Sequence, residues 1–249
     1  MRKNPFVKIS YSFALALGLA AFLAFGQTSA SSGLQGGTVP KAFSPKPDFS
    51  ASKEAKKTKR LKVDIRTKYG ILPVDTEGPN GTIWTSEHLM ELSKTLAMLP
   101  KEFRLGTTQI IREAVFPEYQ ELLAAAIPET LDRFKVFDSA LSSMDKPEGR
   151  GMFRRTIVHE MTITFLKAAP KLLEEWESTF WEKGIPSKPP SGSPTVYGNV
   201  SPLEDMAETV CEYLMAGPLL RKADPARFSF VRERIMAGRE FQPDPAMGN

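Results

Sequence analysis

Apolar residues recur at helical spacing in four segments of the chain. In the first, Thr85 or Ser86 can cap a helix whose leucines lie three or four residues apart up to Leu99, just before Pro100. The other three helices are expected at 154–168, at about 202–216 and from Pro225 to about Ala237.

Two shorter segments have the composition of strands. Residues 107–112 and 134–138 are β-prone, and we expect them to pair in one small sheet, with a helix over 119–126 between them. Strands followed by helices indicate an α+β fold, in which the sheet packs on one side against the helices.

The first 30 residues have the order of a secretory signal. Three basic residues (Arg2, Lys3 and Lys8) precede an apolar stretch over 13–25, and small residues follow up to Ala30. We expect a signal peptide over 1–30, cleavage after Ala30, and a secreted or periplasmic protein. The alternative is an uncleaved anchor, but the apolar stretch is shorter than the ~20 residues of a spanning helix. We therefore expect no stable membrane span after signal removal.

Residues 31–60 are rich in Ser, Gly, Pro and Lys, and lack apolar periodicity. We interpret them as a disordered linker that precedes a folded domain over 61–245. A basic run from Lys53 to Lys62 spans the end of this linker and the start of the domain. Such a run either is solvated charge or binds an anionic surface such as lipid headgroups, and the first interpretation is favoured.

The composition limits which classes of partner the protein is expected to bind and what its cysteine is expected to do. Lys and Arg number 33 against 29 Asp and Glu, but the leader holds three of the basic residues, which leaves 30 against 29. A nearly neutral domain gives no reason to expect a nucleic-acid partner. The single cysteine, Cys211, excludes an intrachain disulfide, and core packing explains it better than metal binding.

The first candidate site is the pair His159-Glu160. It lies in the apolar segment 156–165, where two adjacent ionisable groups are costly unless they are paired or face a cleft. The other histidine, His88, is interpreted as a surface residue.

A second candidate cluster follows about 45 positions later. Glu204 and Glu208 are four residues apart and share one helix face, and Tyr197 precedes them. One carboxylate could bind a metal while the other orients a histidine. The same residues also fit a helix start, because Ser201 and Glu204 have capping-box spacing.

Together these motifs resemble the glu-zincin metallopeptidases, and most closely the group related to the catalytic domain of anthrax lethal factor. The resemblance spans about 84–240 and rests on His-Glu in an apolar helix, followed by Tyr-x6-Glu-Asp-x-x-Glu on a second helix. It implies a zincin-like domain in which a small sheet packs against the active-site helix, with helices at the C-terminus. It also implies roles for five residues: His159 and Glu204 as zinc ligands, Glu160 as general base, Tyr197 as oxyanion donor and Glu208 as the carboxylate that orients His159.

One position departs from the pattern. The family's second zinc histidine stands four residues after the first, where this chain has Ile163, so its HExxH motif is incomplete and Zn²⁺ binding is placed in doubt. The resemblance implies a zinc metallopeptidase, complete or degenerate, that hydrolyses peptide bonds through a zinc-activated water and acts on a peptide or protein. The alternative is an inactive pseudopeptidase that binds a peptide or an envelope partner.

Overall fold

Four short strands form one sheet in the order β1-β2-β4-β3. Strands β1 (Leu72–Val74), β2 (Gln109–Glu113) and β4 (Arg133–Phe137) are parallel, and β3 (Ala124–Ala126) is an antiparallel edge strand. The coordinates are a computed structural model that describes residues 49–77, 81–114, 122–127, 129–181 and 192–240. The predicted pairing of the two β-prone segments is confirmed by the register of Ile110 with Phe134. The predicted signal peptide lies outside the described residues.

The prediction of a helix over 119–126 is wrong for those of its residues that the structure describes. Residues 124–126 form β3, whose three alanines pair with Val136, Lys135 and Phe134 of β4. Alanine favours a helix locally, but pairing with a buried strand outweighs that weak preference. Of the rest of that prediction, residues 122–123 are not helical, and 119–121 lie outside the described residues.

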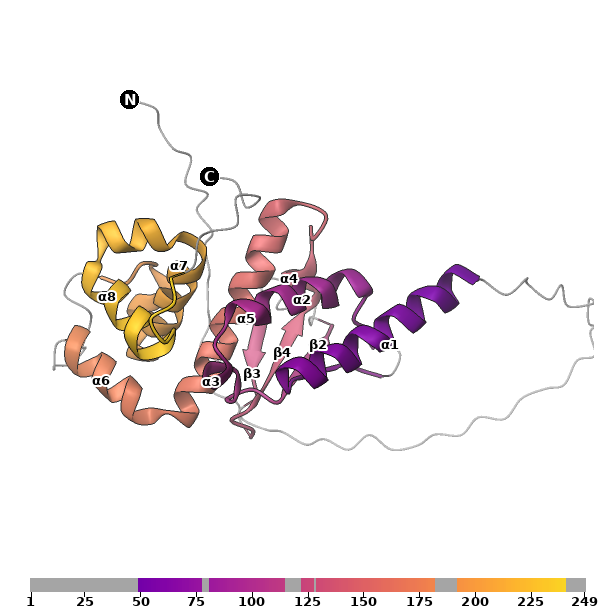
Figure 1. Cartoon of the computed structure of the whole chain (residues 1–249), viewed down its shortest axis with the longest axis horizontal. Helices are drawn as coiled ribbons and strands as arrows, with labels where there is room; N and C mark the ends of the chain where they lie inside the picture. The colour runs from indigo at the N-terminus through magenta and orange to yellow at the C-terminus, as the bar shows by residue number, and fades with distance from the viewer. Residues whose placement is uncertain (1–48, 78–80, 115–121, 128, 182–191, 241–249) are drawn as a thin grey trace, which may run out of the picture. The chain divides into compact units, whose positions relative to one another are not determined.

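Two long helices, α5 (Pro147–Ala168) and α7 (Pro202–Ala223), form the centre of the domain. In Figure 1 the sheet, α1 and α2 lie on one side of α5, and α6–α8 lie on the other. The predicted helix at 154–168 is present but starts earlier, with a proline in its first turn. The helix predicted over 202–216 continues beyond a break in helical geometry at Ala216.

The remaining helices surround this centre. Helix α2 (Ser86–Met98) has the predicted Thr85 cap, whose side chain accepts a hydrogen bond from the His88 amide. The others are α1 (Phe49–Tyr69), α3 (Lys101–Arg104), α4 (Asp138–Leu141), α6 (Pro170–Phe180), η2 (Tyr197–Val200), α8 (Pro225–Phe230) and the π-helix η3 (Val231–Ile235). The α+β class is therefore confirmed. Among the described helices, none combines the length and apolar character that crossing a bilayer would need.

Helix α1 corrects the predicted linker. Residues 49–60 form the first half of this helix, and the compact unit begins at Ser50 instead of 61. The helix has little apolar character, so its sequence resembles a linker. It is attached through Ile65 and Tyr69, which are buried, and through the Glu54 carboxylate, which accepts a hydrogen bond from the Ser86 amide at 2.9 Å. Residues 31–48 lie outside the described residues.

The loop before β2 packs directly on the backbone of α5, at a place where only glycine fits. A Cβ on Gly106 would lie 2.7 Å from the Phe165 Cα. The contact is fixed nearby by the Thr107 and Thr164 hydroxyls, which are 2.6 Å apart.

We expect Gly106→Ala to lower the free energy of unfolding by about 1–3 kcal/mol, because backbone cannot move aside as a side chain can. Gly151→Ala is the control, since nothing lies within 4 Å of its added Cβ and alanine favours the helix there. Urea unfolding of both variants tests the contact. Equal effects of the two substitutions would contradict it.

Candidate functional site

Helices α5 and α7 place two rows of functional side chains opposite each other. On α5, Arg155, His159 and Ile163 are spaced by four residues. On α7, Glu204, Glu208 and Glu212 have the same spacing. Residues four apart lie on one helix face, so each row points at the other. We call these six residues the α5–α7 ladder.

His159 stands between two carboxylates of this ladder. Its Nδ1 is 2.9 Å from Glu208 Oε1, and its Nε2 is 3.0 Å from Glu204 Oε2. The imidazole and both carboxylates are largely buried, with side chains 9–20% exposed. The structure therefore brings together the three residues that the sequence singled out around His159.

Arg155 fixes the orientation of Glu208. Its Nη2 donates to Glu208 Oε2 at 2.6 Å, and its Nη1 donates to Glu212 Oε1 at 2.7 Å. Each Glu208 oxygen thus has its own donor, one from Arg155 and one from His159. Sequence reasoning missed Arg155 and Glu212, although their spacing of four from His159 and Glu208 was a usable signal.

Glu204 differs from Glu208 because one of its oxygens lacks a hydrogen bond. Within the described residues, its Oε2 is buried and accepts no hydrogen bond of acceptable geometry, although His159 Nε2 is 3.0 Å away. An unsatisfied buried carboxylate oxygen is costly unless a cation or a ligand completes it. The predicted capping role is also present, since the Ser201 side chain accepts a hydrogen bond from the Glu204 amide. Backbone and side chain of Glu204 therefore serve different purposes.

Glu160 and Tyr197 lie beside this cluster. The Tyr197 ring is 5.9 Å from the His159 ring, centre to centre, and comes from the short helix η2 that precedes α7. Burial raises the pKa of Tyr197, and the charge of Glu204 raises it further. Burial also raises the pKa of Glu160 to about 7; the positive charge of His159 opposes this shift, and the negative charge of Glu204 adds to it.

The electrostatic surroundings of His159 and Glu208 favour an ionised pair between these two residues. Burial alone would lower the pKa of His159, but its close polar contacts with Cys211, Glu204 and Glu208 outweigh burial and raise the pKa well above its ordinary value. Burial would raise the pKa of Glu208, yet its hydrogen bond with His159 and the charge of Arg155 bring it down to about 2. Both pKa shifts favour a positively charged His159 beside an ionised Glu208.

The acid dependence of stability should report on Glu208. Its pKa is below the ordinary 4.5, so its contribution is complete above about pH 5 and is lost as the pH falls from 4.5 towards 2. We expect Glu208→Gln to lower the free energy of unfolding by roughly 3 kcal/mol at pH 7, and by progressively less below pH 4.5. Urea unfolding between pH 3 and pH 7 measures both effects.

Glu212→Gln is the matched control, because it removes the other carboxylate on Arg155 and keeps the bond between His159 and Glu208. This control should retain the wild-type loss of stability in acid. A Glu208→Gln protein whose unfolding free energy follows the wild-type pH curve would contradict the assigned role of Glu208.

Ile163 occupies the next step of the ladder beyond His159, where the family pattern has its second zinc histidine. Its side chain is buried, with 6% exposure. Arg155 meets Glu212 and Glu208, while His159 meets Glu208 and Glu204, so the two rows run antiparallel. Continuing this register places Ile163 beside Glu204 and its unsatisfied oxygen.

Cys211 is buried in the hydrophobic core, as expected from the sequence. It also lies beside the site, because potential ligand atoms of His159, Glu208 and Cys211 are within 4.8 Å of one another. This group of side chains could hold a metal ion. However, Arg155 already neutralises Glu208, and the Cys211 thiol, whose pKa burial raises, donates to the Arg155 carbonyl. The Nε2 side of His159, which faces Glu204, therefore suits a cation better than the Nδ1 side.

A metal between His159 and Glu204 fits the local donors in part. Zinc ligands lie about 2.0–2.2 Å from the ion, so a separation of 3.0 Å between Nε2 and Oε2 allows one ion to reach both. The unsatisfied Glu204 oxygen also supports a cation between these two residues. Catalytic zinc sites normally use three protein ligands, and isoleucine supplies none. The residues present therefore fit a weakened, two-ligand site.

His88 is not a simple surface residue. It is half-buried, and its Nδ1 is 2.8 Å from Arg112 Nη1, while Arg112 also pairs with Asp138. Burial and the charge of Arg112 lower the pKa of His88 to about 4, against the opposing effect of Asp138. His88 thus acts as a neutral acceptor at the start of α2.

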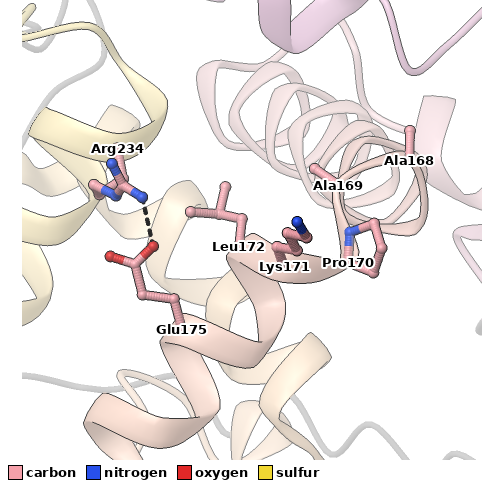
Figure 2. Close-up of a pocket in the computed structure, with 7 residues that line it drawn as sticks. All are labelled: Ala168, Ala169, Pro170, Lys171, Leu172, Glu175 and Arg234. Atoms are coloured by element: carbon pink, nitrogen blue, oxygen red, sulfur yellow. Dashed lines mark hydrogen bonds and ion pairs between the residues drawn. The ribbon is translucent and has the colours of Figure 1, made fainter.

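The pocket in Figure 2 lies away from this site. It has a volume of about 420 Å³ at the junction of α5 and α6, and is closed on one side by the ion pair between Glu175 and Arg234. Ala168 on its wall is nine residues, or about 13 Å, further along α5 than His159. None of the residues that line it belongs to the α5–α7 ladder.

The fold and the site define an α+β protein with a buried His/Glu cluster between two helices, including a group of side chains that could hold a metal ion. Comparison with known proteins adds no relative, since no family model, curated protein or solved structure matches the chain. The resemblance to the glu-zincins therefore rests on the motifs alone.

Proposed function

We propose that the protein is a secreted or periplasmic zincin-like zinc metallopeptidase with a weakened metal site. The observation that carries this proposal is the Nε2 of His159 facing an unsatisfied oxygen of Glu204, while Glu208 binds Nδ1 on the other side of the ring. A histidine that binds metal through one nitrogen and a carboxylate through the other is the usual arrangement in metal sites.

The surrounding residues suit peptide hydrolysis. His159 and Glu204 would hold Zn²⁺, and the ion when bound would supply a Lewis acid that polarises the carbonyl and activates water. Glu160, with a pKa of about 7, is suited to accept a proton from the attacking water. The Tyr197 hydroxyl, protonated at neutral pH, can donate a hydrogen bond to the developing oxyanion. Arg155 holds Glu208 in place through a charged hydrogen bond.

A second candidate function is favoured by Ile163. A buried isoleucine at the missing ligand position supports a pseudopeptidase, which would keep the fold and bind a peptide or an envelope partner without cutting it. Loss of a ligand that contacts the metal should cost more than the 10–100-fold in affinity that loss of a supporting carboxylate costs.

Hydrolysis of a mixed peptide library, followed by mass spectrometry, distinguishes the two functions. We expect new peptide termini when zinc is present in excess, no cleavage after chelation, and no cleavage by His159→Ala. A wild-type protein that leaves the library intact at saturating zinc would overturn the peptidase proposal. Retention of uncut peptides on that same protein, lost in His159→Ala, would then support the pseudopeptidase.

A further inference from the structure

The exposed face of α1 carries a row of positive charge. Lys53, Lys56, Lys57 and Arg60 follow the spacing i, i+3, i+4 and i+7, so they lie on one face of the helix. All four are exposed, and the face that carries Ile65 and Tyr69 packs on the domain. We call these four residues the α1 basic stripe. Over seven residues it extends about 10 Å along the helix axis.

The charges on α1 are sorted between its two faces. The Glu54 carboxylate is turned towards the domain, where it accepts the Ser86 amide hydrogen bond, and Lys62 pairs with Asp75 on the same side. Two acids lie near the stripe: Glu54, whose pKa is lowered by hydrogen bonds from Ser86 and by the charge of Lys57, and Asp64. The contact of Asp64 with Arg60 is long, at 3.8 Å, between well-exposed side chains. Such an exposed pair leaves most of the positive potential in place.

The stripe lies on a part of the molecule that can approach a flat surface. In Figure 1 the N-terminal half of α1 extends beyond the sheet and α2. Residues 52–57 of this half are exposed all round the helix. Further exposed cations, Lys59, Arg66 and Lys68, flank the stripe along the helix.

We propose that the α1 basic stripe binds the anionic headgroups of a lipid bilayer and holds the domain at the membrane surface. A row of lysines on one helix face is suited to negatively charged lipid, and each cation near such a surface contributes about 1 kcal/mol, or roughly a fivefold gain in affinity. Residues 52–60, which carry the stripe, include no aromatic side chain that could stack on bases, which favours lipid over single-stranded nucleic acid. The expected export signal also directs the chain to a membrane.

Vesicle co-sedimentation of the full chain tests this inference. We expect binding to phosphatidylglycerol/phosphatidylcholine vesicles at 0.1 M salt, weaker binding as salt rises, and little binding to pure phosphatidylcholine. The fourfold variant Lys53→Gln, Lys56→Gln, Lys57→Gln, Arg60→Gln should bind at least 100-fold more weakly. Residues 1–48 are identical in all the proteins compared, so any binding through them is the same.

A matched variant removes the same charge elsewhere in the domain: Lys101→Gln, Lys146→Gln, Lys171→Gln, Lys222→Gln, all exposed in the structure. It should keep vesicle affinity within about fivefold of the wild type, and circular dichroism checks that both variants are folded. Equal losses in the two variants would overturn the proposal, as would equal binding to both kinds of vesicle. Stripe-dependent binding to duplex DNA or polyglutamate without binding to vesicles would show that the partner class is wrong.

Discussion

Asp205→Ala is expected to lower the free energy of unfolding by about 3–5 kcal/mol, because it removes the shared acceptor of a buried network. Asp205 Oδ2 accepts hydrogen bonds from Trp176 Nε1 at 3.0 Å, Trp181 Nε1 at 2.9 Å and Arg227 Nη2 at 2.9 Å. The Asp205 and Arg227 side chains are fully buried. Removing the carboxylate would leave two indole N–H groups without this acceptor and would take one of its two carboxylate partners from the buried Arg227 guanidinium, which also pairs with Asp224. Both losses are costly in a low-dielectric interior.

The network ties the C-terminal helices to α7. Trp176 belongs to α6, Arg227 to α8 and Asp205 to the first turn of α7, next to Glu204. Urea unfolding followed by tryptophan fluorescence would measure the loss. Arg234→Ala is the control, since its ion pair with Glu175 also joins the C-terminal segment to α6 but is exposed, and should cost less than about 1 kcal/mol. Similar losses in both variants would show that burial of the network contributes little.

Glu160→Gln is expected to lower kcat for peptide hydrolysis by about 10²–10⁴, the usual contribution of a general base. Gln has the size of Glu but cannot accept the proton. Because Glu160 is not one of the proposed zinc ligands, zinc stoichiometry should stay unchanged. Initial rates at saturating zinc and peptide, together with metal analysis of the same samples, measure the two quantities separately.

The control for Glu160 is Glu148→Gln, an exposed carboxylate in the first turn of the same helix. It should hydrolyse peptides at the wild-type rate. If Glu160→Gln kept its activity, the proton would have to be accepted by another group. If it lost zinc along with activity, Glu160 would be part of the metal site.

The sequence predicts more of the candidate site than of the fold around it. Glu204 and Glu208 were identifiable because residues four apart share a helix face, and His159 because an ionisable pair is unusual in an apolar helical segment. The role expected of Tyr197 came from the resemblance to the glu-zincins. Arg155 was missed because an arginine one turn before a histidine resembles ordinary surface charge until its partners are known.

Two predictions of local structure that differ from the observed fold have a common cause. Residues 124–126 are strand despite their alanines, and residues 49–60 are helix despite their polar composition. In each case the local sequence preference is weak, and contacts distant in the chain decide the outcome: pairing with β4 in the first, and attachment through Ile65 and Tyr69 in the second. Such contacts cannot be read from a short window of sequence.

We propose that His159 and Glu204 form the remaining part of a zinc site in which Ile163 replaces a ligand. Zinc affinity, measured by competition with a chelator in the wild type and in Ile163→His, tests this most directly. Ala168→His serves as control, since it adds an exposed imidazole nine residues from His159, on the opposite face of α5.

We predict a weak 1:1 site in the wild type and an affinity at least about 100-fold higher in Ile163→His, with no gain in Ala168→His. Placing a polar ring in this buried position should cost about 1–3 kcal/mol without metal, and zinc should restore the thermal midpoint. Ile163→Cys, which is smaller and also a zinc ligand, provides a second test if the histidine variant fails to fold. Equal zinc affinity in the wild type and the Ile163 variants would contradict the account.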